Sequence, residues 1–490
     1  MTAAVGRHRI EAMTPDLEAT LERLAAETMP FYRIPGLAIA VVRDGEVVLR
    51  RGFGVRDIAT GEPVTPTTRF AACSLTKSFA AAALGLWVDA GRVRWDTRVR
   101  EVLPEFGLAD PVAAERCTLR DLLLHRSGLG RHDIVWSAGD RDPAAMLAAL
   151  PHLAPVREFR DGCAYSNLGY LVAGLAVERL AGRPWVDEVA DRLLGPSGMT
   201  GASFALDRPA DDAWPHVVVD EAPVRAQREP IAASPAGGLI ASVDDLARWA
   251  VLLLEAERAG DAAVLPAAIV QEMTRPQVYA EPPLHPEFGD ALHNGLGLWR
   301  NGYRGARQWE HTGSWVGWST ILAMLPDHRT GVVVLSNRNA SPVPAMLAYA
   351  VHDAVLGLEP IDWFGRIAPL REKALAAARD EAAARDAEDA AAAPTARHLR
   401  DYAGAYRHAG YGTMQVAVDG DGLSWSFARW SERLRPAGAD AFRLPGYADR
   451  PFPDHRILSF AADDAGRIDR VEVAFEPDLP AAVFVRVDRS

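Results

Sequence analysis

Hydrophobic residues near the start of the chain recur at two different periods. Between residues 14 and 30, leucines return every three or four positions, which predicts an amphipathic helix that begins at Thr14-Pro15-Asp16. From Gly36 to Gly54, two apolar runs flank Asp44-Gly45, a dipeptide typical of a β-hairpin turn. Residues 79–88 are apolar almost all round, which indicates a helix buried in the middle of a domain.

Strand patterns return only after a long helical and loop-rich region that extends to about residue 275. Residues 320–325 and 331–335 are short apolar runs, as expected of buried strands. Because strands at both ends enclose the helices, we expect one α+β unit whose sheet is assembled from both ends of the segment.

The end of the chain follows a different pattern. Residues 370–393 are rich in Ala, Glu, Asp and Arg, and Pro394 ends the run. We interpret this segment as a solvated connecting helix rather than an interaction helix. Beyond it, residues 414–427 and 471–487 contain short alternating runs, which predict a small antiparallel barrel or sandwich. We therefore predict three parts: an α+β domain over residues 1–365, large enough to carry a catalytic site, a helical linker over 366–397 and an all-β barrel domain over 398–490.

Composition narrows the class of protein. At 490 residues the chain is longer than one hydrophobic core usually supports. Its 49% hydrophobic and 24% charged residues are those of an ordinary globular protein. The net charge of −12 argues against a nucleic acid or an anionic membrane as a partner. No apolar run reaches the roughly 18 residues that a membrane span needs.

The cysteines and the first residues bear on the compartment. Cys73, Cys117 and Cys163 are odd in number and widely spaced, which suits free thiols in a reducing compartment better than a disulfide framework. The N-terminal residues carry charges and no apolar signal segment. We therefore expect a cytoplasmic protein.

Lysine is almost absent from the chain. Of 53 basic residues only Lys77 and Lys373 are lysine. A helix would place Ser74 and Lys77 on one face, one turn apart. Arginine stays charged in proteins, whereas an ammonium buried beside a hydroxyl can lose its proton and then accept one. The pair therefore indicates a serine nucleophile activated by an amine.

Two further motifs complete such chemistry. In Tyr165-Ser166-Asn167, the amide of Asn167 can hold the amine while the Tyr165 phenol relays a proton. His311-Thr312-Gly313 precedes a predicted strand, where a small residue would let a substrate backbone lie along the strand edge. The sequence contains no H-E-x-x-H, Walker or G-x-G-x-x-G motif, so neither a metal nor a cofactor is expected.

These three motifs, in this order, resemble those of the serine β-lactamase and penicillin-binding-protein superfamily, and most of all class C enzymes and the related esterases and D-aminopeptidases. Residues 122–129, 235–239 and 332–337 are also similar, and the resemblance covers roughly residues 15–358. Residues 400–488 resemble the lipocalin-like domain found behind a subset of these hydrolases. The fold implied is a β-lactamase/transpeptidase-like α+β domain, an antiparallel sheet with a helical domain, followed by a lipocalin-like β-barrel.

The resemblance also implies roles for individual residues. Ser74 would be the acylated nucleophile and Lys77 the amine that activates it. Tyr165 would act as general base and acid, and Asn167 would orient Lys77 and the substrate amide. The backbone N–H groups of Ser74 and Ser314 would form the oxyanion hole.

His311 departs from the lysine usual in penicillin-recognising members. An imidazole is mostly neutral at pH 7 unless its pKa is shifted, which disfavours β-lactams and favours esters, amides or peptides. His311 is counted with the catalytic residues, and Thr312, Gly313, Trp315 and Arg429 are the expected substrate contacts. Trp315 either lines the cleft or packs inside the fold, and Arg429 either holds a substrate carboxylate or lies on a solvated barrel rim. Structural roles are expected for His125 and for Arg131-His132-Asp133.

The predicted activity is that of a serine hydrolase working through a Ser74 acyl-enzyme on a peptide, amide or ester substrate, tolerant of D-residues. With an amine as acyl acceptor the same chemistry gives a peptide cyclase, like the penicillin-binding-protein-type thioesterases that release nonribosomal peptides. A non-catalytic peptide-binding protein on this fold is the third alternative. The natural substrate, the acceptor and the oligomeric state stay open at this point.

Overall fold

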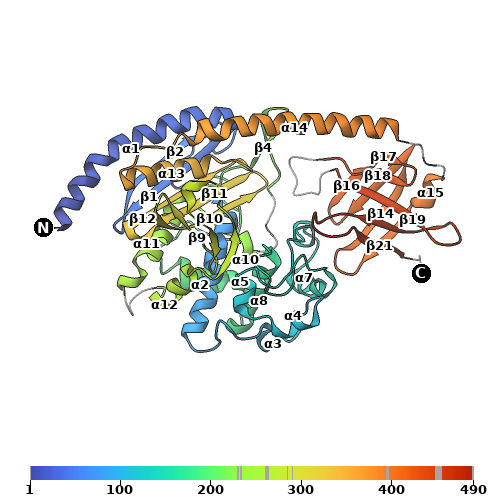
Figure 1. Cartoon of the computed structure of the whole chain (residues 1–490), viewed down its shortest axis with the longest axis horizontal. Helices are drawn as coiled ribbons and strands as arrows, with labels where there is room; N and C mark the ends of the chain where they lie inside the picture. The colour runs from blue at the N-terminus through green and yellow to red at the C-terminus, as the bar shows by residue number, and fades with distance from the viewer. Residues whose placement is uncertain are drawn as a thin grey trace.

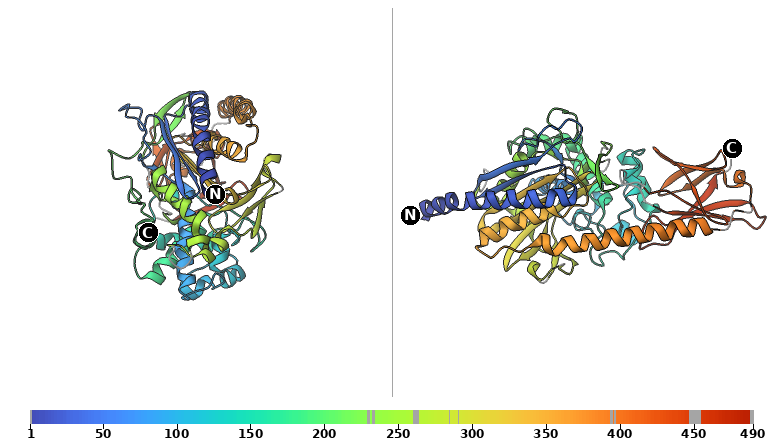
Figure 2. Two further views of the ribbon diagram at one scale, coloured as in Figure 1. Left: turned by 90° about the vertical axis from the view of Figure 1, so that its left-hand side faces the viewer. Right: turned by 90° about the horizontal axis from the view of Figure 1, so that it is seen from above.

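The computed structural model describes residues 2–228, 231, 234–259, 264–283, 285–289, 291–392, 395, 397–446 and 455–487. An α+β body, a long helix and an all-β barrel follow one another along the chain (Figure 1). The helix, α14 (Trp363–Ala391), runs from the α+β body to the barrel, and the view from above shows it alongside both (Figure 2). The predicted fold class is confirmed.

The α+β body is built on an eight-stranded antiparallel sheet in the order β2-β1-β12-β11-β10-β9-β8-β7. The early strand β1 pairs with the late strand β12, so both ends of the segment supply the sheet, as predicted. In the turn between β1 and β2, Asp44 and Gly45 both have positive φ, the conformation of a two-residue hairpin turn. The strands are β1 (Gly36–Arg43), β2 (Glu46–Gly54), β7 (Val278–Glu281), β8 (Leu292–Asn294), β9 (Trp299–Tyr303), β10 (Ala306–Trp315), β11 (Trp318–Leu325) and β12 (Thr330–Ser336).

Side chains alternate between the two faces of the sheet along each strand. In the central strands β1, β12 and β11 the residues on both faces are buried. Helices α1 (Thr2–Tyr32) and α13 (Val343–Leu356) cover one face, where Ile321 and Ala323 of β11 are fully buried. Helix α11 (Val243–Ala259) covers the other face, where Leu322 is buried. We refer to these as the α13 face and the α11 face.

Helix α1 is longer than the predicted helix over residues 14–30. It begins at Thr2 and runs through Thr14-Pro15-Asp16 without a break. The preceding residues include Ala, Arg, Glu and Met, which favour helix. Proline removes one backbone donor, and here that loss does not end the helix, so the predicted start at Thr14 is wrong.

A helical region packs against the α11 face and carries most of the loops. Its central helix is α2 (Thr76–Asp89), the predicted buried helix, in which the first eleven residues are buried. Helix α8 (Asn167–Ala181) lies against α2. The remaining elements of the body are α3 (Val99–Val102), α4 (Pro111–Arg116), α5 (Leu119–Leu123), α6 (Ile134–Ser137), α7 (Pro143–Ala149), α9 (Trp185–Val189), α10 (Ser234–Gly237), α12 (Ala267–Thr274), and the short pairs β3 (Phe70–Ala71) with β6 (Ile240–Ala241) and β4 (His216–Val219) with β5 (Ala222–Arg225).

Helix α14 is the predicted connecting helix. It begins earlier than residue 370, and Trp363 is its one fully buried side chain among those described, which agrees with a solvated helix. Pro394 lies outside the described residues. The Arg443 guanidinium of the barrel donates to Asp389 near the end of α14 at 2.9 Å, so the helix is tied to the domain that follows it. Among the helices described, none combines the length and the apolar character needed to cross a membrane.

The barrel is a nearly closed antiparallel sheet of nine strands. Tyr402, Tyr406, Trp425 and Phe484 fill its interior. In the last strand the alternating valines, among them Val485, point outward, and Phe484 between them points inward. The elements are α15 (Leu399–Tyr402), β13 (Gly404–His408), β14 (Gly412–Asp419), β15 (Gly422–Phe427), β16 (Trp430–Arg433), β17 (Arg435–Gly438), β18 (Ala441–Arg443), β19 (Ile457–Ala462), β20 (Ile468–Val473) and β21 (Ala482–Val487).

Candidate active site

Ser74 lies in a single 3₁₀ turn, Cys73–Leu75, that leads directly into α2. The prediction placed it within the same helix as Lys77, one turn earlier. Cys73 adopts a left-handed φ of 52°, a costly conformation for a residue with a side chain and one that concentrates at functional sites. The turn is fixed by two bonds, from Thr76 Oγ1 to the Cys73 carbonyl at 2.7 Å and from Ala72 N to the Leu239 carbonyl at 2.8 Å. Ser74 is therefore held partly exposed between buried neighbours.

Lys77 is completely buried next to this serine. Its Nζ is 3.1 Å from Ser74 Oγ, 2.9 Å from Asn167 Oδ1 and 2.7 Å from the Ala236 carbonyl oxygen. Burial, reinforced by the Arg131 guanidinium, lowers the pKa of Lys77 well below its ordinary value. A neutral amine has two N–H donors and one lone pair. The two carbonyl-type oxygens can take the donors, which leaves the lone pair for the Ser74 hydroxyl proton.

Tyr165 approaches Ser74 from the other side. Its phenol lies 2.9 Å from Ser74 Oγ and donates to it. Burial raises the pKa of Tyr165 above its ordinary value of 10.0, and the Arg131 guanidinium opposes this shift. The phenol is thus protonated near neutral pH. Ser74 Oγ therefore contacts both a proton acceptor, the Lys77 amine, and a proton donor, the Tyr165 phenol.

Asn167 is oriented by residues that sequence reasoning assigned to a structural loop. Its Nδ2 donates to Asp133 Oδ1 at 3.0 Å, so its oxygen must face Lys77. Asp133 also accepts from Trp136 Nε1 at 2.9 Å and from Arg131 Nε at 2.8 Å. The prediction missed Asp133 and Arg131, because nothing in their local sequence shows that this loop reaches Asn167.

His125 takes the structural role expected of it. Its Nδ1 accepts from the backbone N of Ser166 at 3.0 Å, and its ring lies 4.3 Å from that of Tyr165 between centroids. The imidazole therefore supports Tyr165 through both the backbone and the ring.

His311 lies on β10, close to the same cluster. Its ring is 6.5 Å from the Tyr165 ring and 5.8 Å from the Trp299 ring. Burial first, and then the nearby Lys77, lower the pKa of His311 to about 3. Its Nδ1 lies 2.6 Å from the Thr312 carbonyl oxygen, which fits an N–H at that atom. The imidazole is therefore neutral at pH 7, and this position supplies no permanent cation.

The residues after His311 point to alternate sides of β10. Gly313 faces the turn of Ser74, where a Cβ would lie 2.7 Å from the Ala72 carbonyl oxygen and 2.9 Å from Cys73 Cβ. Glycine is thus needed for the close approach of β10 to the catalytic turn, a reason the sequence did not reveal. Thr312 lines a cavity on the α13 face, so only its backbone is turned toward the site.

The edge of β10 beyond Glu310 has room for a substrate strand. Strand β9 pairs with β10 only as far as Glu310, so among the described residues His311–Trp315 has a strand neighbour, β11, on one side alone. Ser314 is exposed there. Trp315 packs on Trp136 at 4.6 Å between ring centroids, so it forms a wall at the end of this edge and is partly inside the fold.

The barrel contacts the loop that carries Arg131 and Asp133. Tyr411 OH lies 2.8 Å from His132 Nδ1, and Arg141 donates to the Gly410 carbonyl at 2.7 Å. Arg429 donates to the carbonyl of Ser137 at 2.9 Å, so it lies at the contact between the two domains. Its binding of a substrate carboxylate stays a prediction.

Family comparisons agree with this geometry. Residues 21–356 match the family model described as Beta-lactamase, and residues 388–485 match one described as a domain of unknown function, DUF3471. The chain belongs to the beta-lactamase family. It is a member of the serine β-lactamase and penicillin-binding-protein superfamily of hydrolases.

Individual relatives point the same way. The chain is 28% identical over 457 residues to the unguisins hydrolase ungD of Aspergillus violaceofuscus, covering 82% of this chain and 77% of that one. It is 30% identical over 368 residues to a D-aminopeptidase of Cereibacter sphaeroides, covering 72% and 67%. The fold matches that of the octameric penicillin-binding protein homologue from Pyrococcus abyssi, with a TM-score of 0.62 at 23% identity over 95% of this chain and 99% of that one.

Proposed function

We propose that the protein is a serine hydrolase that forms an acyl-enzyme at Ser74 on peptide, amide or ester substrates, including those with D-residues. The observation that carries the proposal is the meeting of Lys77 Nζ and Tyr165 OH on Ser74 Oγ, at 3.1 Å and 2.9 Å. A low pKa of Lys77 and a high pKa of Tyr165 make one group the base and the other the acid.

Acylation proceeds by one proton circuit. Neutral Lys77 accepts the Ser74 proton as Oγ attacks the substrate carbonyl carbon, and the backbone N–H groups of Ser74 and Ser314 receive the developing oxyanion. Tyr165 gives its proton to the departing amine or alcohol. The resulting phenolate then takes a proton from the Lys77 ammonium. In deacylation a water molecule gives a proton to Lys77 as its oxygen attacks the ester carbonyl carbon. Tyr165 then protonates Ser74 Oγ as the bond from Oγ to the acyl carbon breaks, and it regains a proton from the Lys77 ammonium, which restores the starting state.

Arg131 supplies the cation that a neutral His311 does not. The guanidinium carbon lies 5.4 Å from the centroid of the Tyr165 ring. A positive charge there favours the phenolate and the neutral amine, because it lowers the pKa of both Tyr165 and Lys77. Arg131 acts through these two groups and is a positioning residue in this mechanism.

The proposed substrate class, peptides and esters rather than penicillins, is supported by the lack of charge on His311 and by the similar proteins. A neutral His311 gives no anchor for the carboxylate of a penicillin, and the free edge of β10 suits an extended peptide. A D-aminopeptidase and an unguisins hydrolase are among the similar proteins. The barrel holds the loop of Arg131 through Tyr411, so it borders the region that a longer substrate would occupy.

The test is covalent labelling by a fluorophosphonate, followed by the intact mass of the protein. Wild type should gain one adduct, Ser74→Ala should gain none and lose nearly all turnover of p-nitrophenyl esters, and the barrel variant Ser431→Ala serves as control. Undiminished labelling of the Ser74→Ala protein would disprove the assignment. Absence of any adduct on the folded wild type would favour the non-catalytic alternative.

The acyl acceptor is decided by a second experiment. A linear peptide thioester or ester with a free N-terminal amine is incubated with enzyme, and the products are resolved by mass. Loss of the leaving group with gain of water supports hydrolysis, whereas loss without water identifies the cyclase. The proposed hydrolase requires the first product to predominate.

A further inference from the structure

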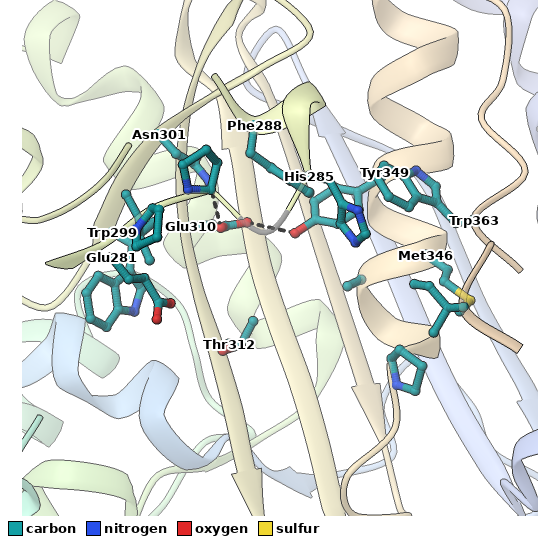
Figure 3. A pocket seen from close by; sticks show the side chains of 16 residues that line it. Glu281, His285, Phe288, Trp299, Asn301, Glu310, Thr312, Met346, Tyr349 and Trp363 are labelled. Carbon is teal, nitrogen blue, oxygen red and sulfur yellow. Dashed lines mark hydrogen bonds between the residues drawn. The ribbon is translucent and has the colours of Figure 1, made fainter. Parts of the chain in front are cut away.

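A cavity of about 350 Å³ lies behind the catalytic strand, on the α13 face of the sheet (Figure 3). Glu310 and Thr312 of β10 form its floor. They pair with Ala323 and Ile321 of β11, which belong to the core on the α13 face. His311 lies between them and points to the opposite face. The cavity therefore lies behind β10 from Ser74, and one of its lining residues, Trp299, stacks on Tyr165 at 6.2 Å between ring centroids.

The floor of this cavity holds a buried carboxylate. Glu310 is 8% exposed. Its Oε1 accepts from Asn301 Nδ2 at 2.9 Å, and its Oε2 accepts from Gln308 Nε2 at 2.8 Å and from Tyr349 OH at 3.1 Å. A carboxylate offers about four acceptor sites, so one site remains, on Oε1.

These three donors are neutral, and the charge of Glu310 is not balanced. Among the described residues no arginine, lysine or histidine forms an ion pair with it, and burial raises the pKa of Glu310 to about 7. A buried anion without a cation is costly. A cation placed in the open cavity beside this carboxylate would complete an ion pair with it.

Aromatic rings form the walls that face this carboxylate (Figure 3). Phe288 lies 5.0 Å from Tyr349 and 5.8 Å from Trp363 between ring centroids, and Tyr349 lies 5.8 Å from Trp363. His285 packs on Trp363 at 5.2 Å. Ring faces attract organic cations and also bind apolar groups. The lining of the cavity thus combines the carboxylate of Glu310 with an aromatic surface on which an apolar part of a ligand can pack.

We propose that this cavity binds a small organic ammonium ion, a primary amine on an aryl or alkyl body, whose N–H donates to Glu310 Oε1 while its body packs on Phe288, Tyr349 and Trp363. Charge complementarity selects this occupant. A neutral apolar ligand would leave Glu310 without a counter-ion, and an anion would meet both Glu310 and the rim carboxylate Glu281. The site is distinct from the catalytic cleft and does not depend on the activity proposed for it.

The test uses phenethylamine and 2-phenylethanol, which share a ring and differ in the charge of the polar end. Isothermal titration calorimetry at pH 8 on the full chain should show the amine binding about tenfold or more tightly than the alcohol, as expected for a charged hydrogen bond. The same preference should appear in the Ser74→Ala protein, because the site lies behind the strand. Equal affinities, or no binding of the amine, would overturn the proposal.

Two variants locate the site. Glu310→Gln keeps the shape and removes the charge, so it should weaken the amine about tenfold or more and leave the alcohol within about threefold. Glu281→Gln removes the same charge at the exposed rim, and there the loss should stay below about threefold because solvent screens it. A larger loss in Glu281→Gln than in Glu310→Gln would contradict the role of the buried carboxylate.

A third variant covers the case in which Glu310→Gln does not fold. Ala345→Phe on α13 fills the cavity and keeps Glu310, and its thermal unfolding shows whether the fold is retained. A folded Ala345→Phe protein should bind neither ligand. Amine binding that survives in this folded variant would place the ligand elsewhere and overturn the proposal.

Discussion

Replacing Arg131 by glutamine removes the cation above Tyr165 and keeps a side chain of similar length. Arg131 lowers the pKa of both Lys77 and Tyr165, so without it both values rise. Catalysis needs Lys77 neutral and Tyr165 protonated. The acid limb of the pH–rate profile, set by Lys77, should therefore move to higher pH, whereas the basic limb, set by Tyr165, lies above pH 10 in both proteins.

The distance in the structure sets the size of the shift. Two charges 5.4 Å apart, the distance from the Arg131 guanidinium to the Tyr165 ring centroid, interact by about 3 kcal/mol at an effective dielectric constant of 20 and about 0.8 kcal/mol in bulk water. The Arg131 side chain is 56% exposed and paired with Asp133, so the lower part of this range applies. About 1 kcal/mol corresponds to roughly 0.7 pH unit in the pKa of Tyr165. Lys77 Nζ lies 4.9 Å from the centroid of the same ring, and a shift of the same order in its pKa gives roughly a fivefold loss of kcat/KM on the acid limb.

The measurement is kcat/KM for a p-nitrophenyl ester from pH 5 to pH 10, since this ratio reports the pKa values of the free enzyme. Arg131→Lys keeps the charge and should retain most of the wild-type profile. Arg92→Gln removes an exposed arginine that lies over Trp87, near the other end of α2, and should change nothing. A slower Arg131→Gln enzyme whose acid limb stays at the wild-type pH would refute the electrostatic role.

Three further outcomes follow from the site. Lys77→Arg should lose about 10²–10⁴-fold in turnover because the charge is kept and the proton acceptor is lost; retention of more than a tenth of wild-type kcat would make Lys77 a structural cation. Gly313→Ala should lower stability by about 1–3 kcal/mol in denaturant unfolding and also lower kcat, since its Cβ would push β10 away from Ala72; unchanged stability would show that the strand has room to shift. Wild type should hydrolyse penicillins poorly compared with p-nitrophenyl esters, and His311→Lys should raise β-lactam acylation only modestly; efficient penicillin turnover by wild type would refute the argument from a neutral His311.

Local patterns were enough to predict the fold class and several of the elements. The β1–β2 hairpin follows from Asp44-Gly45, the buried helix α2 from its apolar residues, and α14 from its charged and alanine-rich composition. These signals involve residues only a few positions apart. At that range, the backbone preferences of turn residues and the spacing of apolar side chains determine the local structure. Alternation alone did not reveal which side of a strand is buried, and in β21 the interior residue is Phe484 between exposed valines.

The motif residues of the site were predicted by type, together with the contacts of Lys77 with Ser74 and Asn167, whereas the other contacts were not. Ser74 and Lys77 are three positions apart, so their meeting follows from helical geometry. The groups that hold Lys77 come from 90 and 159 positions away, at Asn167 and at the Ala236 carbonyl. A backbone carbonyl has no side-chain signature, so no sequence pattern could have identified Ala236.

The sequence by itself determined the kind of chemistry, because an amine that can lose its proton, a phenol and a hydroxyl are properties of residue types. Tertiary structure decided which of these groups lie within hydrogen-bond distance of one another. It buried Lys77 completely, turned Thr312 away from the site and brought Arg131 over Tyr165. It also left Glu310 beside a cavity, where none of the described cationic side chains pairs with it. Burial and the distance between charges set a pKa, and both arise only when segments distant in the chain pack together.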